Sequence, residues 1–414
     1  MKSAVSRRRF LAFTAGSVVT AAGVGRQASA QWQSDDGRPL NDYCVAQVSS
    51  SALKHNIALI RRELKPTTRF CAVVKANCFS LGWSACKDAI IPEADWLAVA
   101  TPQEAFAVRE SGCQLPVLLL MASGFYGATS RERLRRFIAQ DITLTVAALG
   151  DLATISSVAE EVGKPAKIHI KIDTGMGRSG VLPDRAPALA QQARRQSGII
   201  LDGIYTHYAT ADAANKTYAK GQLARFHKAL KACGNAAKDV ILHTAASAAT
   251  IDIPETHLDM VRVGTAMYGY QPSDEMHRVL PLRPALRVVA RLSQIKEAPA
   301  GTRVGYGLTY QFDRPAKLGL VPMGYADGYR RCLSNKAVMR VVGQYAPVRG
   351  RVSMDQTIID LTDIPAAKVG DEVEVISPET DAPNSADNLA RLADTIVPEI
   401  VSGLGSRVQR VTTS

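Results

Sequence analysis

The sequence lacks several features that mark other classes of protein. Its seven cysteines contain no C-x-x-C pair, so a structural zinc site is not expected, and no other metal site is predicted. No internal repeat or low-complexity tract is visible. No basic block longer than a few residues follows residue 30, so nucleic-acid binding has no specific support. The odd number of cysteines leaves at least one unpaired within the chain, and no pairing can be assigned.

The first 30 residues lack acidic side chains and have the order of an export signal. Ser6–Leu11 contains a twin-arginine start, an uncharged and weakly apolar segment follows, and Ala28–Ala30 offers a small-x-small cleavage site. The apolar segment is too short and too rich in Gly, Ala and Thr to span a bilayer. We therefore expect residues 1–30 to be a twin-arginine signal peptide, the mature protein to be periplasmic, and no membrane association.

Removing this segment changes the charge of the working protein. Five basic residues and no acidic residue leave with it, so the net charge of +12 falls to about +7. About 380 residues remain, which is enough for two domains of ordinary size. The twin-arginine route carries proteins that are already folded.

Short apolar runs alternate with helix-like stretches through the first two thirds of the mature chain. The runs are Phe70–Val74, Trp96–Ala100, Pro116–Met121, Ile142–Val146, Lys167–Ile172, Gly203–Thr206, Val240–Leu242 and Met260–Val263. Each gap is long enough for a crossover helix. The first helix is visible in Leu53, Ile57, Ile60 and Leu64, behind a possible N-cap at Ser49–Ser51. No glycine-rich dinucleotide loop follows the first run, so a closed eight-stranded (β/α) barrel over residues 31–282 is favoured over a doubly wound sheet.

The pattern changes after Leu282 to short strands separated by Gly and Pro turns, with one helix near residues 385–393. The expected strands are Ala285–Glu297, Leu318–Pro322, Val338–Val342, Val348–Ser353, Thr357–Leu361 and Glu372–Ile376. Residues 283–414 are therefore predicted to form a mostly β domain.

Polar side chains follow several strands of the predicted barrel, at the end where barrel enzymes place their active sites. Lys75 follows the first strand, Arg178 the fifth, His207 the sixth, His243 and Ser247 the seventh, and Arg262, Gly264 and Thr265 the eighth. A lysine in this position can hold a carbonyl cofactor as a Schiff base. Ser247 with the backbone at Gly264 and Thr265 could form a phosphate cup. Together these residues suggest pyridoxal phosphate, although each alone is more often structural.

Seven blocks in this order resemble the alanine racemase family. They are Ala72–Asn77, Lys171–Gly180, Thr206–Asp212, Val261–Gly269, Val304–Gly307, Gly324–Tyr329 and Gly350–Gln356. The resemblance runs from about Cys44 to Arg410. It implies a barrel followed by a β domain, pyridoxal phosphate as cofactor and an amino-acid racemase that acts on alanine.

The resemblance also implies roles for individual residues. Lys75 would hold the cofactor and act as one base, and Tyr306 would be the second base, reaching into the barrel of a partner subunit in a homodimer. Racemisation needs two such groups because a proton leaves one face of the α-carbon and another returns to the opposite face. Both groups must have their pKa lowered from about 10. Arg262 would face the pyridine nitrogen and, because arginine keeps its proton, would leave that nitrogen unprotonated and discourage side reactions.

The remaining assignments follow from the same resemblance. Arg178 would bind the substrate carboxylate and hold Tyr306, and His207 and His243 would belong to the cofactor site. Met354 would lie at the pocket lip supplied by the second subunit. Lys171 matches a lysine that is carbamylated in some members of the family.

Three positions depart from the family pattern: Phe79 and Ser406 replace phosphate-side tyrosines, and Ala246 replaces an asparagine before Ser247. Each lost hydrogen bond to a charged group costs about 1.5–3 kcal/mol unless it is replaced. Weaker cofactor binding or a roomier pocket would follow. The alternatives are therefore a racemase of broader substrate range and a periplasmic cofactor-binding homologue without catalysis. A decarboxylase or D-amino-acid aldolase on the same barrel is disfavoured by Arg262 and by the absence of a clear metal-ligand cluster.

Overall fold

The computed structural model describes residues 43–122 and 130–414. The predicted signal peptide at residues 1–30 lies outside the described residues. Among the described helices, none combines the length and the apolar character needed to cross a bilayer. All seven cysteines lie in the described part and are free thiols, with only Cys332 exposed.

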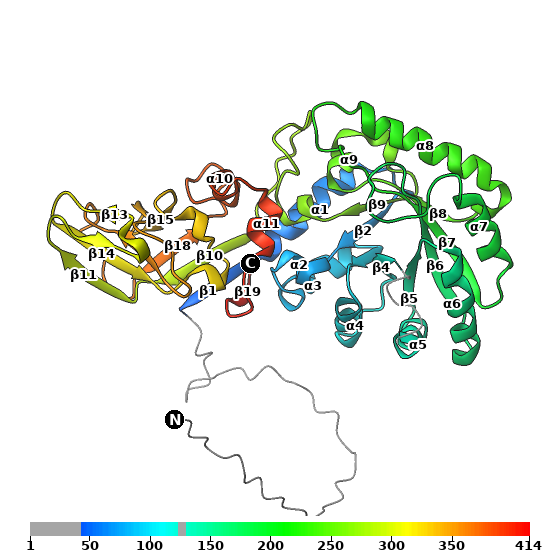
Figure 1. Cartoon of the computed structure of the whole chain (residues 1–414), viewed down its shortest axis with the longest axis horizontal. Helices are drawn as coiled ribbons and strands as arrows, with labels where there is room; N and C mark the ends of the chain where they lie inside the picture. The colour runs from blue at the N-terminus through cyan, green and yellow to red at the C-terminus, as the bar shows by residue number, and fades with distance from the viewer. Residues whose placement is uncertain (1–42, 123–129) are drawn as a thin grey trace, which may run out of the picture. The chain divides into compact units, whose positions relative to one another are not determined.

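Eight parallel strands form the barrel in the order β8-β7-β6-β5-β4-β3-β2-β9 (Figure 1). Their bounds are β2 (Arg69–Val73), β3 (Trp96–Val99), β4 (Val117–Ala122), β5 (Ile142–Val146), β6 (Ala166–Lys171), β7 (Ile199–Tyr205), β8 (Ile241–His243) and β9 (Met260–Val263). A bridge between Ala246 and Arg262 joins the two ends of this order, so the barrel is nearly closed. The prediction of an eight-stranded barrel is confirmed.

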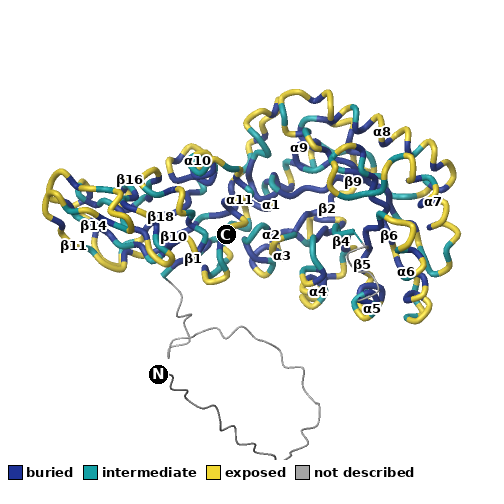
Figure 2. Tube along the Cα trace, viewed as in Figure 1, coloured by how far each residue is buried: buried dark blue, intermediate teal, exposed yellow. Residues whose placement is uncertain are grey.

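Helices cover the outside of the barrel and bury the outer face of its strands, while the inner face packs within the barrel. Both faces are buried, which explains why the strands are almost continuously apolar (Figures 1 and 2). They are α1 (Ser50–Arg62), α3 (Trp83–Ile90), α4 (Pro102–Glu110), α5 (Arg131–Ala139), α6 (Leu149–Val162), α7 (Ala186–Arg195), α8 (Thr217–Cys233) and α9 (Ser247–Asp252). The predicted opening helix is confirmed: Ser49 Oγ accepts from Ala52 N at 3.1 Å, and Leu53, Ile57 and Ile60 are buried.

The second domain is built mainly from antiparallel strands. Its largest sheet has the order β16-β15-β18-β10-β1-β19, and a second sheet has the order β11-β14-β17. The bounds are β1 (Cys44–Ser49), β10 (Leu286–Arg291), β11 (Gln294–Ala298), β12 (Arg303–Val304), β13 (Tyr310–Gln311), β14 (Ala316–Val321), β15 (Val338–Val341), β16 (Gln344–Pro347), β17 (Thr357–Asp360), β18 (Glu372–Ile376) and β19 (Gln409–Thr413). Two helices follow β18, namely α10 (Ala386–Leu392) and α11 (Val397–Ser402).

The structure corrects the expected start of the barrel domain. Strand β1 precedes the barrel in the sequence, but it lies between β10 and β19 in the six-stranded sheet. Residues 31–282 therefore do not all belong to the barrel. The sequence of a strand does not specify which strands it pairs with, and the partners of β1 lie far away in the sequence.

Two of the expected strands are also corrected. The run Ala285–Glu297 divides into β10 and β11, which belong to different sheets. The strand expected at Val348–Ser353 instead lies at β16, in a hairpin with β15 whose two-residue turn is Val342-Gly343. Both turn residues have positive φ, 49° and 75°, which matches a primed hairpin turn. A β-branched valine rarely has a positive φ, so the sequence did not indicate a turn at Val342.

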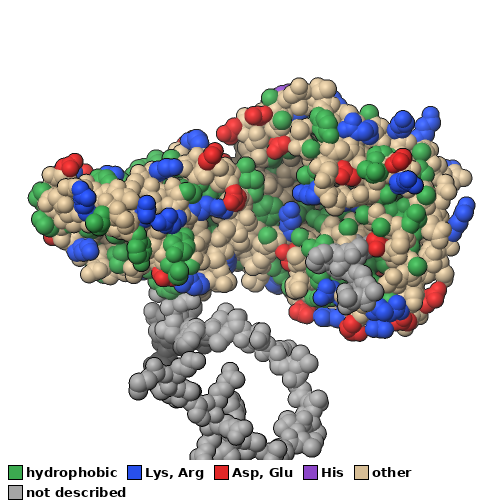
Figure 3. All heavy atoms as spheres, in the orientation of Figure 1, with side chains coloured by type: hydrophobic (Ala, Val, Ile, Leu, Met, Phe, Trp, Pro, Cys, Tyr) green, Lys and Arg blue, Asp and Glu red, His purple; other side chains and the backbone are tan. Residues whose placement is uncertain are grey.

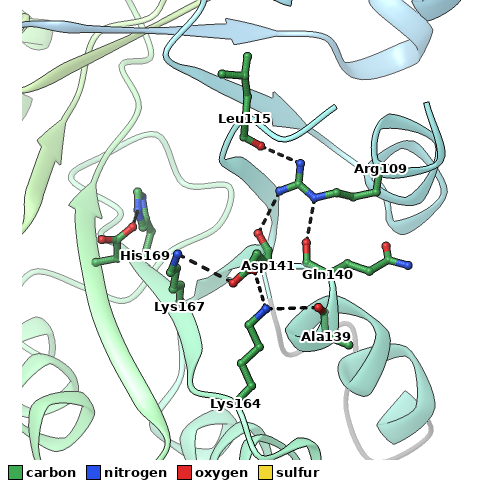
Figure 4. A network of polar contacts seen from close by, with 9 residues as sticks. Arg109, Leu115, Ala139, Gln140, Asp141, Lys164, Lys167 and His169 are labelled. Atoms are coloured by element: carbon green, nitrogen blue, oxygen red, sulfur yellow. Dashed lines mark hydrogen bonds and ion pairs between the residues drawn. The ribbon is translucent and has the colours of Figure 1, made fainter. Parts of the chain in front are cut away.

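A polar network ties the ends of the strands that lie opposite the predicted site (Figure 4). Arg109 on α4 donates to the carbonyls of Leu115 and Gln140 at 2.7 and 2.8 Å. Lys164 Nζ lies 2.5 Å from the carboxylate of Asp141, which precedes β5. These contacts join residues before β4, β5 and β6, so they stabilise the barrel at its N-terminal face.

Candidate active site

The residues that follow the barrel strands surround one cavity of about 690 Å³. Of the predicted site residues, those that line it are Lys75, Arg178, His207, Ser247, Arg262, Gly264 and Thr265. They come from the C-terminal ends of different strands and from the segments that follow, which the parallel strands bring to one end of the barrel. On the molecular face drawn in Figure 3, acidic and basic side chains are interspersed, with neither sign forming a continuous patch.

Lys75 begins a left-handed turn directly after β2. The next five residues, Ala76 to Ser80, all have φ between 51° and 63°, and none of them is glycine. Left-handed backbone costs about 1–2 kcal/mol per residue for ordinary amino acids. This segment, α2 (Lys75–Phe79), is therefore strained, and strain of this kind gathers at functional sites.

Packing and hydrogen bonds from several elements hold this turn. Glu104 of α4 accepts the Ala76 N–H at 2.6 Å with one carboxylate oxygen and the N–H groups of Ala100 and Thr101 at 2.8 and 3.0 Å with the other. Tyr268 donates its hydroxyl hydrogen to the carbonyl of Val73 at 3.1 Å. Because these partners are fixed by the barrel, the backbone that carries Lys75 is fixed as well.

The cavity concentrates positive charge. Burial, and then the charge of Arg178, lowers the pKa of Lys75 from its ordinary value, while Glu104 opposes this shift. Burial, and then Arg178 and Arg262, lowers the pKa of Lys171 to about 8. Lys171 Nζ donates to Ser179 Oγ at 2.7 Å. Four basic groups around one cavity match a ligand that carries phosphate and carboxylate charges.

Arg262 lies at the floor of the cavity and is only 3% exposed. Its guanidinium donates to the carbonyl of Thr206 and to His243 Nδ1, both at 2.8 Å. It also lies 3.3 Å from His207 Nδ1 and over the ring of Tyr205. Burial, followed by the charge of Arg262, keeps the pKa of His207 and of His243 well below the ordinary value, so both histidines are neutral. His243 itself lies behind Arg262 and does not line the cavity.

Ser247 lies where two backbone N–H groups converge. Its hydroxyl oxygen accepts from Gly264 N at 3.1 Å and from Ala266 N at 3.4 Å. A Cβ on residue 264 would lie 3.1 Å from the ring of Phe79, so glycine leaves the space that brings this backbone to the cavity. Ser247 and Gly264 therefore lie together, as a phosphate cup would require, and the second N–H comes from Ala266, where the sequence had indicated Thr265.

Arg178 is carried by a tight loop after β6. Asp173 Oδ1 accepts the N–H groups of Gly175, Met176 and Gly177 at 3.0, 2.8 and 3.1 Å. A Cβ at Gly180 would lie 2.6 Å from the backbone nitrogen of Asp173, so a larger residue does not fit there. This loop presents the exposed guanidinium of Arg178 at the cavity rim.

Two of the departures from the family pattern line the cavity, and one does not. Phe79 packs against Tyr268 with ring centroids 4.8 Å apart, so its ring fills the place and only a hydroxyl is missing. Ala246 lines the wall beside Ser247. Ser406 is exposed and is not among the lining residues. Glu104 was missed by sequence reasoning, although the T-x-x-E spacing from Thr101 is that of a capping box.

Comparisons with known proteins match both domains. The model of the alanine racemase N-terminal domain covers residues 48–272, and that of the C-terminal domain covers residues 285–412. An alanine racemase of Desulfovibrio desulfuricans is 39% identical over 368 residues, which are 88% of this chain and 97% of that protein. The chain belongs to the alanine racemase family.

Solved structures of this family have the same architecture. An alanine racemase of Clostridium difficile 630 has a TM-score of 0.84 and 32% identity, covering 90% of this chain and 96% of that one. The alanine racemase of a D-cycloserine-producing Streptomyces lavendulae has a TM-score of 0.83 and 33% identity, covering 90% and 97%. The resemblance inferred from the seven sequence blocks is confirmed.

Two predicted site residues of the alanine racemase family pattern lie on the second domain and do not reach the cavity of their own chain. Tyr306 opens a short 3-10 turn in the second domain and is 70% exposed, and Met354 is 53% exposed. Neither residue lines the cavity. A single chain therefore assembles the site around Lys75 without the residue expected to be the second base.

Proposed function

We propose that this chain interconverts L- and D-alanine with pyridoxal phosphate, with Lys75 and Tyr306 as the two proton carriers. The observation that carries the proposal is the convergence of Lys75, Arg178, Ser247 and Arg262 on one cavity, in a chain of the alanine racemase family. A lysine amine, a pair of backbone donors and two arginines are the groups that an aldehyde cofactor with a phosphate requires.

The chemistry of this donor set fits the cofactor. Ser247 with the backbone of Gly264 and Ala266 would hold the phosphate, and Lys75 would hold the aldehyde carbon. Arg262 would donate to the ring nitrogen and keep it unprotonated, because arginine does not release its proton. When bound, the cofactor supplies an electron sink that acidifies the α-hydrogen of the amino acid.

The basic residues at the rim prepare the substrate and the lysine. Arg178 would bind the carboxylate of alanine and thereby aim the α-hydrogen at the bases. The lowered pKa of Lys75 increases the fraction of neutral amine, and only the neutral amine can accept a proton. Lys171, whose pKa is lowered to about 8, adds positive charge beside Arg178.

We propose that Tyr306 enters the site of a partner subunit in a homodimer. Its large exposure is unusual for a tyrosine, and other exposed apolar side chains are found in the second domain, including Leu308, Tyr325 and Met354. Apolar groups exposed in this way are commonly buried at an interface. The partner's tyrosine would then face the α-carbon from the side opposite Lys75.

Racemisation of L-alanine by the purified protein, followed as D-alanine formation with added pyridoxal phosphate, tests the activity. We expect turnover with the wild type and its loss in Lys75→Ala. Absence of turnover with alanine in the loaded wild-type protein would overturn the proposal. Other amino acids, offered in parallel, measure the breadth of the substrate range.

Mixing two inactive variants tests the shared site. In a hybrid dimer of Lys75→Ala and Tyr306→Phe, one barrel has both the lysine and the partner's tyrosine. Random exchange of subunits should restore about a quarter of the wild-type activity. If Tyr306 acted on its own chain, mixing would restore nothing.

We further propose that the protein is exported by the twin-arginine route to the periplasm. The support is the sequence order of residues 6–30 alone. Replacing Arg7 and Arg8 by lysine in the full chain should leave racemase activity in the cytoplasmic fraction. Wild-type activity confined to the cytoplasm would contradict this proposal.

A further inference from the structure

A chain of buried polar side chains runs from Arg262 into the barrel interior. Arg262 Nη1 lies 2.8 Å from His243 Nδ1, His243 Nε2 lies 2.8 Å from His169 Nδ1, and His169 Nε2 lies 3.4 Å from a carboxylate oxygen of Asp202. Both histidines are 0% exposed, while the side chain of Asp202 is 29% exposed. We call these four side chains the Arg262 relay; His169 is labelled in Figure 4.

The two ends of the relay determine the direction of every hydrogen bond in it. Arginine can only donate, so His243 Nδ1 must accept and His243 Nε2 must carry the hydrogen. His169 Nδ1 then accepts, and His169 Nε2 donates to Asp202, whose carboxylate can only accept. Each imidazole is thereby held in a single neutral tautomer, with one donor and one acceptor in every contact.

Neighbouring residues leave space for the two imidazole rings and pack against them. A Cβ at Gly203 would lie 2.5–2.7 Å from three ring atoms of His169, so only glycine at this position of β7 leaves room for the imidazole. The ring of Tyr205 stacks on His243 with centroids 4.6 Å apart and an angle of 9°. Tyr205 is fixed in turn by a hydrogen bond of 2.9 Å between its hydroxyl and Thr145 Oγ1.

We propose that His169 and Asp202 are positioning residues that act through His243 on Arg262. Arg262 fixes the tautomer of His243, and His169 fixes where the imidazole lies. Without the acceptor at His169, the His243 Nε2–H is unpaired in the interior, and the ring is no longer held against the guanidinium. Arg262 would then lose one of its partners and its fixed direction toward the cavity. The inference rests on the proposed role of Arg262 as the group that faces the cofactor ring.

The protonation states agree with this geometry. Burial lowers the pKa of His169 and of His243, and the hydrogen bond from His169 lowers the pKa of Asp202. The relay therefore has a cation at one end, a carboxylate at the other and two neutral rings between them. Any break in it leaves a buried donor or acceptor without its partner, which is costly in the barrel interior.

Three substitutions separate the relay from simple packing. His169→Leu and, independently, Asp202→Leu remove an acceptor from the relay and leave buried polar atoms unpaired. His169→Gln keeps an acceptor for His243 and a donor for Asp202, so it should restore the direction of the bonds. Ile170→Ala, at the neighbouring buried position of β6, is the matched control for lost packing.

The first measurement needs no cofactor. Imidazole ¹H and ¹⁵N resonances of the cofactor-free full-length protein report the hydrogen bond made by His243 Nε2–H. We expect hydrogen on Nε2 in every variant, because Arg262 still donates to Nδ1, and we expect this hydrogen to exchange faster with solvent and to shift upfield in His169→Leu but not in His169→Gln or Ile170→Ala. An unchanged exchange rate and shift in His169→Leu would overturn the proposal.

The second measurement is made on the loaded enzyme. We expect cofactor affinity to fall about ten- to a hundredfold in His169→Leu and Asp202→Leu, as for other supporting residues of bound groups. Transamination, in which alanine would pass its amino group to the cofactor and leave as pyruvate, should rise relative to racemisation, because a displaced Arg262 no longer keeps the ring nitrogen unprotonated. Ile170→Ala should change neither quantity, and equal changes in it would overturn the proposal. Should the wild type fail to racemise alanine, the proposed function fails, whereas the measurement on the His243 Nε2–H still tests the relay.

Discussion

At the residue scale, burial and neighbouring charges determine the protonation state of each titratable group in the cavity. Lys75 and Lys171 have lowered pKa values because burial and neighbouring arginines disfavour their charged forms. His207 and His243 are neutral for the same reasons. One barrel mouth thus holds neutral histidines, and lysines whose charged forms are disfavoured, beside arginines that stay charged.

Buried histidines also predict how stability depends on pH. The folded pKa values of His169, His207 and His243 lie below the ordinary value of 6.5, so the unfolded chain binds these protons first as the pH falls. The free energy of unfolding should therefore be highest above pH 6.5. It should decrease below it, by at most about 1.4 kcal/mol per pH unit for each histidine. Urea unfolding at several pH values measures this slope. His169→Gln should reduce the slope by the contribution of one titrating histidine.

At the element scale, the left-handed turn after β2 is the distinctive feature. Ala76 is exposed and has φ of 52°, so glycine should relieve strain there with little loss of packing. We expect Ala76→Gly to raise the free energy of unfolding by about 1 kcal/mol. The same change at exposed Ala188, in the right-handed helix α7, should lower it by about 1 kcal/mol. Urea unfolding of both variants gives the comparison, and equal signs would show that the turn is unstrained.

The C-terminal segment braces the same turn. Arg410 Nε donates to the carbonyl of Ser80 at 2.8 Å, and its other nitrogens donate to the carbonyls of Gly405, Leu404 and Val408. Arg410→Met should lower the free energy of unfolding by about 2–3 kcal/mol and weaken cofactor binding, because these buried carbonyls lose a charged donor. Arg314→Met removes an exposed ion pair with Asp363 and should cost less than about 1 kcal/mol. Equal effects of the two substitutions on cofactor affinity would show that Arg410 does not stabilise the turn that carries Lys75.

At the scale of the whole molecule, one chain holds only part of the proposed machinery. The barrel carries the four basic groups, Lys75 among them, whereas Tyr306 and Met354 are exposed on the second domain. The proposed homodimer would complete the site and cover these side chains.

A charge placed on the exposed surface near Tyr306 should separate folding from activity. Leu308 is 55% exposed and lies in the same turn as Tyr306. Leu308→Glu should weaken the dimer and lower racemase activity at least tenfold, while cofactor binding to the barrel remains. Sedimentation, activity and cofactor titration measure the three quantities. Val369→Glu, at an exposed position of the second domain outside this turn, is the control and should retain activity. An active Leu308→Glu dimer would contradict the placement of the interface.

Most of the barrel could be predicted from the sequence because its strands are continuous apolar runs with helical gaps between them. The β domain was predicted less well, since strand β1 finds its partners at the far end of the chain and the Val342-Gly343 turn has an unusual first residue. Lys75, Ser247 and Arg262 could be found because each lies at the C-terminal end of a strand or within a few residues after it. Glu104 and Asp202 were missed because their roles depend on contacts with distant segments.

The sequence by itself determined which chemical groups stand at the mouth of the barrel, since residue order and apolar periodicity place them at strand ends. Only the tertiary structure decided how these groups are held. Five non-glycine residues form a left-handed turn because Glu104 and Arg410 satisfy its backbone, and His169 takes its place because Gly203 leaves room for a ring. Such arrangements depend on atoms brought together across the fold, and no local pattern of residues encodes them.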